Sequence, residues 1–164
     1  MSVDATVSKE GERMDPRIVK ARAFTFVGTV GTATDVADLD IADLWQRFGA
    51  LNEGVENEVE GAGYELHIAL EHGRYCLCGV EVSEVGAVPL GAFATVLPPC
   101  DYAVFTHRLT DGYDAAYKRI NAWLESSEYD EAGPYDFQLY DSRFTSMDDP
   151  ESMQEIWVPV RRAR

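Results

Sequence analysis

Hydrophobic and polar residues follow two periods along this chain, one typical of strands and one typical of helices. Residues 17–33, RIVKARAFTFVGTVGTA, are rich in β-branched and aromatic residues and end in glycine and threonine, which predicts a strand. Residues 38–54, DLDIADLWQRFGALNEG, change to a helical period, with Asp38 or Asp40 as the cap and a glycine at the end. The apolar positions of this helix are Leu39, Leu44, Trp45, Phe48 and Leu51.

Two further strands are predicted in the first half. Residues 63–71, GYELHIALE, and 74–85, RYCLCGVEVSEV, meet at the turn HGR, which predicts a hairpin. Residues 87–100, AVPLGAFATVLPPC, are interrupted by prolines and are expected mostly to connect.

The second half of the chain repeats this order. Residues 101–109, DYAVFTHRL, predict a strand, and residues 111–127, DGYDAAYKRINAWLESS, predict a helix capped by Asp111. Residues 134–144, PYDFQLYDSRF, and 153–161, MQEIWVPVR, predict two more strands around a polar turn. Each half therefore reads strand, helix, strand, strand.

This repetition indicates the fold class. Each unit has one apolar face that its copy can help to cover. The sequence predicts an α+β fold in which a duplicated β-α-β-β module forms one antiparallel sheet, with helices on one side and a central ligand cleft where the halves meet.

The ends and the overall hydropathy predict the domain organisation. Residues 1–14 are polar and aperiodic, so we expect a disordered N-terminal tail followed by a single domain over residues 15–164. No segment approaches the ~18 apolar residues of a membrane helix, and the start lacks the apolar stretch of a signal peptide. We therefore expect a cytoplasmic protein with no membrane partner.

The charge of the chain narrows the class of partner. Lys and Arg number 14 against 29 Asp and Glu, a formal net charge of −15. Because nucleic acid is held largely by cationic side chains, we expect no direct nucleic-acid binding. An acidic protein concentrates cations around itself, so a cationic small ligand suits this field, although such a charge also serves solubility alone.

Cysteines and histidines give no sign of a metal or cofactor. Cys76, Cys78 and Cys100 are odd in number, which argues against a disulfide framework and favours buried, inert thiols. The histidines do not have metal-ligand spacing, and no phosphate-binding loop or nucleophile elbow occurs. We expect neither a metal nor a cofactor.

The second half carries a family resemblance. It contains PPCDYAVFTHRL, a helix with INAWLESS, then PYDFQLYDSRF and MQEIWVPV, and it resembles the GyrI-like small-molecule-binding domain, the effector-binding part of some bacterial AraC- and MerR-type multidrug regulators. The positions that carry the resemblance are Pro99, Thr106, Trp123, Tyr140, Glu155, Trp157 and Pro159. The resemblance spans about residues 16–162 and is looser in the first half.

The resemblance implies binding of bulky aromatic or cationic molecules in the cleft, with a buried glutamate as counter-charge. It also implies two other activities of stand-alone members, hydrolysis of cyclopropanoid natural products and modulation of DNA gyrase. Two features depart from the family pattern. No helix-turn-helix region is present, so we expect a stand-alone protein rather than a complete regulator. Gln138 stands where many relatives carry glutamate, which removes one charge from the cleft.

Alternation in the last predicted strand predicts which face of the sheet carries Glu155. Ile156 and Val158 fall on the face expected under the helices, whereas Glu155 and Trp157 fall together on the opposite, concave face. A carboxylate beside an indole suits a cation, and partial burial would make Glu155 a candidate general acid or base if the protein is an enzyme. The alternative is an exposed edge acid beside a packing tryptophan.

Three neighbouring residues complete the predicted ligand site. Gln138 and Tyr140 share one face of their strand and are expected to share the cleft with Glu155. Tyr140 offers an aromatic face and a hydroxyl, and His67 offers a group that titrates near neutral pH. For both residues, an ordinary structural role is the alternative.

The sequence thus favours a protein that binds an amphipathic aromatic or cationic small molecule, with Glu155 as counter-charge and Trp157, Tyr140, Gln138 and His67 around it. The first alternative is a hydrolase of cyclopropanoid or other electrophilic compounds that uses the same glutamate. The second is a DNA gyrase modulator that acts on a protein partner.

Overall fold

The computed structural model describes residues 15–164, so the predicted tail lies outside the described residues. The helices are α2 (Ile41–Leu51) and α3 (Tyr113–Ser126), with three short 3-10 segments, η1 (Val36–Asp38), η2 (Asn52–Gly54) and η3 (Leu109–Asp111). The strands are β1 (Arg17–Ala21), β2 (Phe24–Ala33), β3 (Gly63–Leu70), β4 (Gly73–Glu81), β5 (Phe93–Leu97), β6 (Cys100–Arg108), β7 (Tyr129–Glu131), β8 (Tyr135–Tyr140) and β9 (Met153–Arg162). Neither helix in the described part of the chain is long and apolar enough to cross a membrane.

The sheet has the symmetry that the repeated sequence predicts. Its strand order is β1-β6-β9-β8-β3-β4-β2-β5, with β7 paired to β9, and the pairings of the named strands are antiparallel. From the central pair β8–β3 outward, each strand of the second half matches its counterpart in the first: β9 with β4, and β6 with β2. The predicted duplicated module and the α+β fold class are confirmed.

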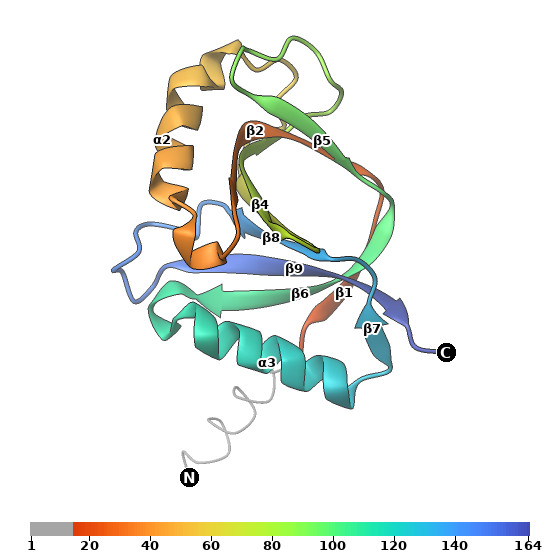
Figure 1. Ribbon diagram of the computed structural model, residues 1–164. Coiled ribbons are helices and arrows are strands. Elements are labelled where there is room, and N and C mark those ends of the chain that lie inside the picture. The colour runs from red at the N-terminus through yellow and green to blue at the C-terminus, as the bar shows by residue number, and fades with distance from the viewer. Residues whose placement is uncertain (1–14) are drawn as a thin grey trace.

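The register of the sheet separates two faces (Figure 1). Cys78, Glu65, Gln138 and Ile156 are successive cross-strand partners from β4 to β9, and directly paired residues lie on the same face. This face carries both helices, because Leu44 of α2 packs on Cys76 and Cys78 while Ile120 of α3 packs on Ile156 and Val158.

The opposite face curls around an aromatic core. This core is formed by Phe26, Tyr64, Leu66, Leu77, Leu97, Tyr102, Val104, Phe137 and Trp157. Leu97 of β5 belongs to it and Val19 of β1 packs against it, so the two ends of the sheet close on the same cluster. The rings meet mostly edge to face, as between Tyr102 and Trp157, whose centroids are 5.5 Å apart.

Of the two helix caps predicted from the sequence, one is confirmed and one is wrong. Asp40 caps α2 by accepting a hydrogen bond of 3.0 Å from the Asp43 N–H, as predicted. The cap predicted for the second helix is wrong. Asp111 lies in η3, and α3 follows Gly112, which has a φ of 83°.

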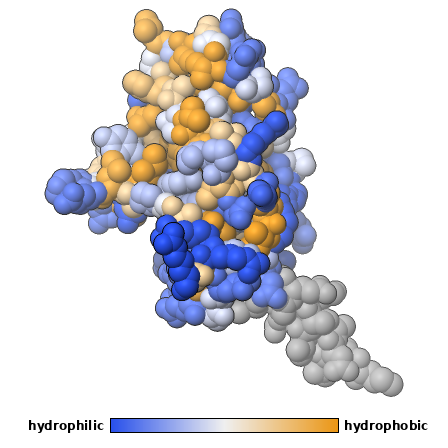
Figure 2. Space-filling view, turned by 90° about the vertical axis from the view of Figure 1, so that its right-hand side faces the viewer, coloured by the Kyte–Doolittle hydropathy of each residue, from blue (hydrophilic) through white to orange (hydrophobic). Residues whose placement is uncertain are grey.

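Two strand predictions also need correction. Residues 17–33 form two strands that lie at different places in the sheet, β1 beside β6 and β2 between β4 and β5. Residues 93–97, expected to be part of a connection, form β5 at one edge of the sheet. Figure 2 shows hydrophobic surface over this upper part of the molecule, where Val85, Leu90, Phe93 and Val96 are exposed.

Candidate functional site

Two adjoining cavities open on the helix-bearing face of the sheet, beside the central strand pair. The α3-side chamber has a volume of about 570 Å³ and includes Glu65, His67, Tyr117 and Asp136 in its lining. The α2-side chamber has a volume of about 560 Å³ and is lined by Ile41, Ala42, Trp45, Gly63, Glu65, Tyr113, Tyr140, Phe144 and Met147. Ile41, Glu65 and Tyr113 line both chambers, so the two form one bipartite groove where the halves of the molecule meet.

Strand alternation places the polar groups of the groove. Glu65 and His67 lie two residues apart on β3, and Asp136, Gln138 and Tyr140 follow the same alternation on β8. Glu65 pairs directly with Gln138, and His67 pairs with Asp136. The two central strands thus present five polar side chains to the helices, while the residues between them point into the aromatic core.

Glu65 lies at the junction of the two chambers. Its side chain is buried, and both carboxylate oxygens have partners. The indole Nε1–H of Trp45 donates to Oε1 of Glu65 at 3.1 Å, and Nε2 of His67 lies 2.7 Å from Oε2 of Glu65. A buried carboxylate needs such compensation, because removal from water disfavours the charged form.

His67 is the titratable partner of this carboxylate. Burial by itself lowers the pKa of His67, but the hydrogen bond to Glu65 and the nearby Cys76 and Asp136 outweigh that effect and raise this pKa above its ordinary value. The imidazole and the carboxylate therefore stabilise each other most strongly when His67 is protonated.

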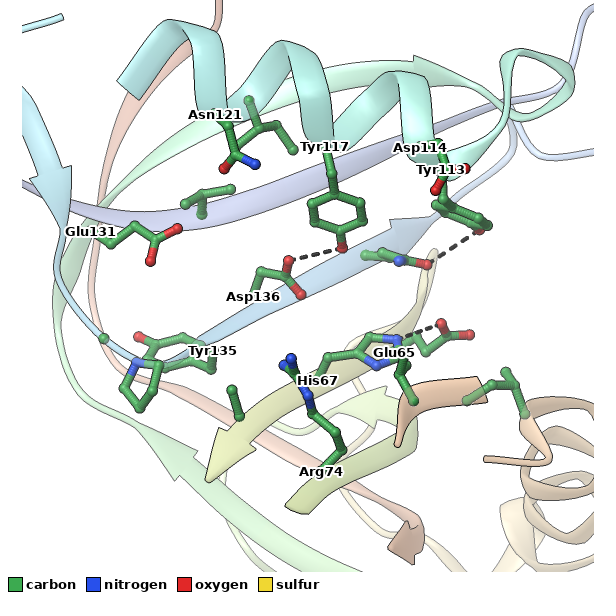
Figure 3. Close-up of a pocket in the computed structure, with 18 residues that line it drawn as sticks. Glu65, His67, Arg74, Tyr113, Asp114, Tyr117, Asn121, Glu131, Tyr135 and Asp136 are labelled. Carbon is green, nitrogen blue, oxygen red and sulfur yellow. Dashed lines mark hydrogen bonds and ion pairs between the residues drawn. The ribbon is translucent and has the colours of Figure 1, made fainter. Parts of the chain in front are cut away.

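Hydroxyl groups from α3 and β8 form a second set of contacts, and Figure 3 shows those of Tyr113 and Tyr117 from α3. Tyr140 donates to Oε1 of Gln138 at 2.8 Å, and the Tyr113 hydroxyl lies 3.4 Å from the same oxygen. Tyr117 donates to Asp136 at 2.8 Å. Burial raises the pKa of Asp136, against the hydrogen bond from Tyr117, which lowers it.

Glu155 and Trp157 lie on the other face of the sheet and line neither chamber. Glu155 is 4% exposed. Its Oε2 forms ion pairs with a guanidinium nitrogen of Arg17 at 2.9 Å and with one of Arg143 at 3.0 Å. Trp157 donates its Nε1–H to Oε1 at 3.0 Å. Burial raises the pKa of Glu155, but the hydrogen bonds from Arg17, Trp157 and Arg143 prevail and lower this pKa.

The expectation that Gln138 and Tyr140 share a face with Glu155 is wrong. The direct partner of Glu155 on β8 is Leu139, and Gln138 pairs with Ile156. The structure therefore brings His67, Gln138 and Tyr140 together in the groove and separates them from Glu155 and Trp157. A ligand role for the latter two stays a prediction.

Among the groove residues that were not singled out as ligand-site residues from the sequence are Glu65, Trp45 and Asp136. Glu65 could have been found, because it precedes His67 by two residues and alternation puts both on one face. Asp136 has the same relation to Gln138. Trp45 was assigned to the helix core, and nothing in the periodicity of α2 distinguishes a core tryptophan from one that also faces a cavity.

Comparison with protein families gives one match over nearly the whole chain. The GyrI-like small molecule binding domain matches residues 14–161. The transcriptional regulator BrlR of Pseudomonas aeruginosa is 31% identical over 158 residues, which cover 90% of this chain and 56% of BrlR. The chain thus spans about half the length of this relative.

Solved structures share the fold at low identity. SAV2435 bound to tetraphenylphosphonium superposes with a TM-score of 0.70 at 18% identity, covering 90% of this chain and 94% of the other. The EcmrR C-terminal domain gives a TM-score of 0.71 at 16% identity, with 90% and 97% covered. A hydrolase from Listeria innocua gives 0.60 at 9% identity, with 94% and 98% covered.

Proposed function

Because this chain belongs to the GyrI-like small-molecule-binding family, we propose that it binds an amphipathic aromatic cation in the groove between α2 and α3, with Glu65 as the counter-charge. The observation that carries this proposal is the position of Glu65. It is a buried carboxylate at the junction of two chambers, and its only charged hydrogen-bonding partner among the described residues is a titratable imidazole.

The charge of the α3-side chamber supports a cation. Its lining includes four acids, Glu65, Asp114, Glu131 and Asp136, against Arg74 and the titratable His67. Side chains in a partly enclosed cavity are less screened by water than those on the surface, so this excess of negative charge attracts a cation.

The α2-side chamber supports an aromatic or apolar group on the same ligand. Trp45, Tyr113, Tyr140 and Phe144 line it, together with the flexible side chain of Met147. Aromatic faces bind both flat apolar groups and cations, and methionine adapts to irregular shapes. Tetraphenylphosphonium, the molecule bound to SAV2435, combines aromatic rings with a permanent positive charge and is the natural first probe.

We also propose that this domain makes no direct contact with nucleic acid. The net charge of −15 opposes binding to a phosphate backbone. In this proposal the small molecule is the partner of the domain, and any effect on DNA arises through another protein or another segment.

The test is a thermal-shift titration of the full chain with tetraphenylphosphonium. At a ligand concentration of about 100 times Kd, binding stabilises the folded state by about 2.7 kcal/mol, which is a shift of roughly 5–10 °C. Glu65→Gln keeps the shape of the side chain but removes its charge, and it should weaken binding at least about tenfold, or about 1.4 kcal/mol.

The matched control is Glu155→Gln, the same chemical change at a buried glutamate on the other face. It should lower the melting temperature of the free protein and leave the ligand-induced shift in place. A shift that survives in Glu65→Gln and disappears in Glu155→Gln would overturn the assignment of Glu65 and support Glu155 instead.

A further inference from the structure

We propose that His67 is an internal cation that competes with the ligand for Glu65, so that a cationic ligand binds as His67 loses its proton. This inference rests on the proposed function and adds a specificity-determining residue to it. It predicts that the site prefers cations at alkaline pH and is closed to them by its own imidazolium at acidic pH.

The geometry places one proton between the two side chains. Nε2 of His67 lies 2.7 Å from Oε2 of Glu65, and the other carboxylate oxygen accepts from the Trp45 indole. Both acceptor oxygens of Glu65 are therefore occupied by protein groups before a ligand arrives. The indole is neutral, so His67 is the group within hydrogen-bonding distance that can neutralise the carboxylate.

Both members of the pair face the cavity (Figure 3). Glu65 and His67 line the α3-side chamber, and their side chains are 7% and 20% exposed. A ligand cation that approaches Glu65 consequently also approaches the imidazolium. Two positive charges at one buried carboxylate repel each other strongly in a site shielded from water, and the proton on His67 is the charge that can leave.

Other charged groups face His67 from each neighbouring strand. Asp136 on β8 is a direct cross-strand partner of His67 and favours the protonated imidazole, as does the thiolate form of Cys76, its partner on β4. Arg74 of β4 lines the same chamber and, as a cation, disfavours the proton. From α3, Tyr117 donates to Asp136 and occupies one of its oxygens.

Glu131 and Asp114, also in the chamber lining, add negative charge farther out. The balance of all these groups in the free protein is a raised pKa of His67. The neighbours of His67 thus favour its protonated form, and Glu65 is the neighbour that a ligand cation would engage.

Competition between the proton on His67 and the ligand makes ligand affinity depend on pH. In the free protein His67 is protonated up to its raised pKa, and in the complex the ligand lowers that pKa by occupying Glu65. Between the two pKa values, binding releases up to one proton, and ligand affinity rises with pH by as much as about tenfold per pH unit. Above the pKa of the free protein, affinity becomes independent of pH.

The experiment is isothermal titration calorimetry of the full chain with tetraphenylphosphonium, which carries no titratable proton. Titrations in phosphate and in Tris, whose ionisation enthalpies differ, give the number of protons released at each pH; we expect release of up to one proton between the pKa values of His67 in the free protein and in the complex. Affinity should increase at least about fivefold between about pH 6 and about pH 8.

His67→Gln keeps a hydrogen-bond donor beside Glu65 but cannot titrate. It should release no proton, bind with pH-independent affinity, and bind more tightly than the wild type at about pH 6. His72→Gln, at a histidine whose side chain is 89% exposed, is the matched control and should behave as the wild type.

The outcomes separate this inference from the proposed function. Wild-type binding with no proton release and equal affinity at both pH values overturns the competition and leaves the groove as a cation site. Proton release that persists in His67→Gln would assign the proton to another group and would also overturn the competition between His67 and the ligand. Absence of tetraphenylphosphonium binding at every pH overturns both.

Discussion

Glu65 and Glu155 are buried glutamates two strands apart in the same sheet, and the partners of their carboxylates differ in kind. Glu155 meets two guanidinium groups, which remain charged at every pH at which the protein folds. Glu65 meets an indole and an imidazole, so its compensation depends on a titratable proton. The first carboxylate is thus permanently neutralised within the structure, and the second can exchange its partner.

This difference predicts the effect of Glu155→Gln on stability. The change leaves Arg17 and Arg143 without their shared acceptor charge, and at neutral pH it should lower the free energy of unfolding by about 2 kcal/mol. Both arginines are about half exposed, which keeps the loss below that of a fully buried pair. Urea denaturation of the wild type and the variant measures the difference.

The stabilisation that Glu155 gains from Arg17 and Arg143 depends on pH. Because the folded-state pKa of Glu155 is lowered, its contribution is complete above the ordinary carboxyl pKa and disappears as pH falls through the folded value. The gap between wild type and Glu155→Gln should therefore narrow from about pH 5 toward about pH 2. A gap that is constant over this range would show that the carboxylate charge does not stabilise the fold.

At the scale of single residues, the sequence predicted which side chains alternate but not which faces join across strands. Glu155 and Trp157 do lie opposite the helix-facing Ile156 and Val158, as alternation required. The face of Gln138 depended on the register between β8 and β9, which alternation within one strand does not contain. A shift of one residue reverses every side chain, and the polar pair was assigned to the wrong face for this reason.

At the scale of the strands, β2 and β4 approach each other unusually closely at one point. Gly28 of β2 pairs directly with Gly79 of β4. A Cβ atom at Gly79 would lie within 3 Å of the Val27 backbone, at 2.0 Å from its carbonyl oxygen. Two facing glycines thus allow a contact that no larger residue fits, between the strands that carry α2 on one side and the aromatic core on the other.

Gly79→Ala should consequently destabilise the protein strongly, by about 3 kcal/mol, because backbone atoms must move to admit the methyl group. Gly49→Ala is the matched control. Gly49 lies on the exposed side of α2 with no atom within 4 Å of an added Cβ, and alanine is a better helix former by about 1 kcal/mol. Chemical denaturation should move the two variants in opposite directions, and equal effects would contradict the close approach.

The elements themselves were largely predictable, since their signals are local. The hairpin β3–β4, both helices and the repeated order follow from periodicity and turn residues. The break between β1 and β2 was missed, because residues 21–23 carry neither proline nor glycine. β5 was missed for the opposite reason: the prolines around it suggested a connection, yet they lie outside the five residues that pair with β2.

At the scale of the whole molecule, the groove lies where the two repeats meet, and the repeats contribute unlike groups. The first half supplies Glu65, His67 and the indole of Trp45, while the second half supplies the hydroxyl groups of Tyr113 and Tyr140. A duplicated fold has thus produced a site with the buried Glu65–His67 pair on one side and the hydroxyl groups of Tyr113 and Tyr140 on the other. Such a site suits a single asymmetric ligand between two related halves.

The three tryptophans of the chain report on three separate places. Trp45 lines the α2-side chamber, and its indole N–H is bound to Glu65. Trp157 is bound to Glu155 on the opposite face, and Trp123 stacks with Tyr129 near the end of α3. Their indole N–H resonances therefore distinguish the groove from the core face in a single spectrum.

The most direct test of the account is a ¹⁵N–¹H correlation spectrum of the full chain titrated with tetraphenylphosphonium. If the ligand binds in the groove at Glu65, the indole resonance of Trp45 shifts and saturates with the titration, while those of Trp157 and Trp123 change little. A titration in which the Trp157 indole shifts and the Trp45 indole stays in place would contradict the account and move the site to Glu155.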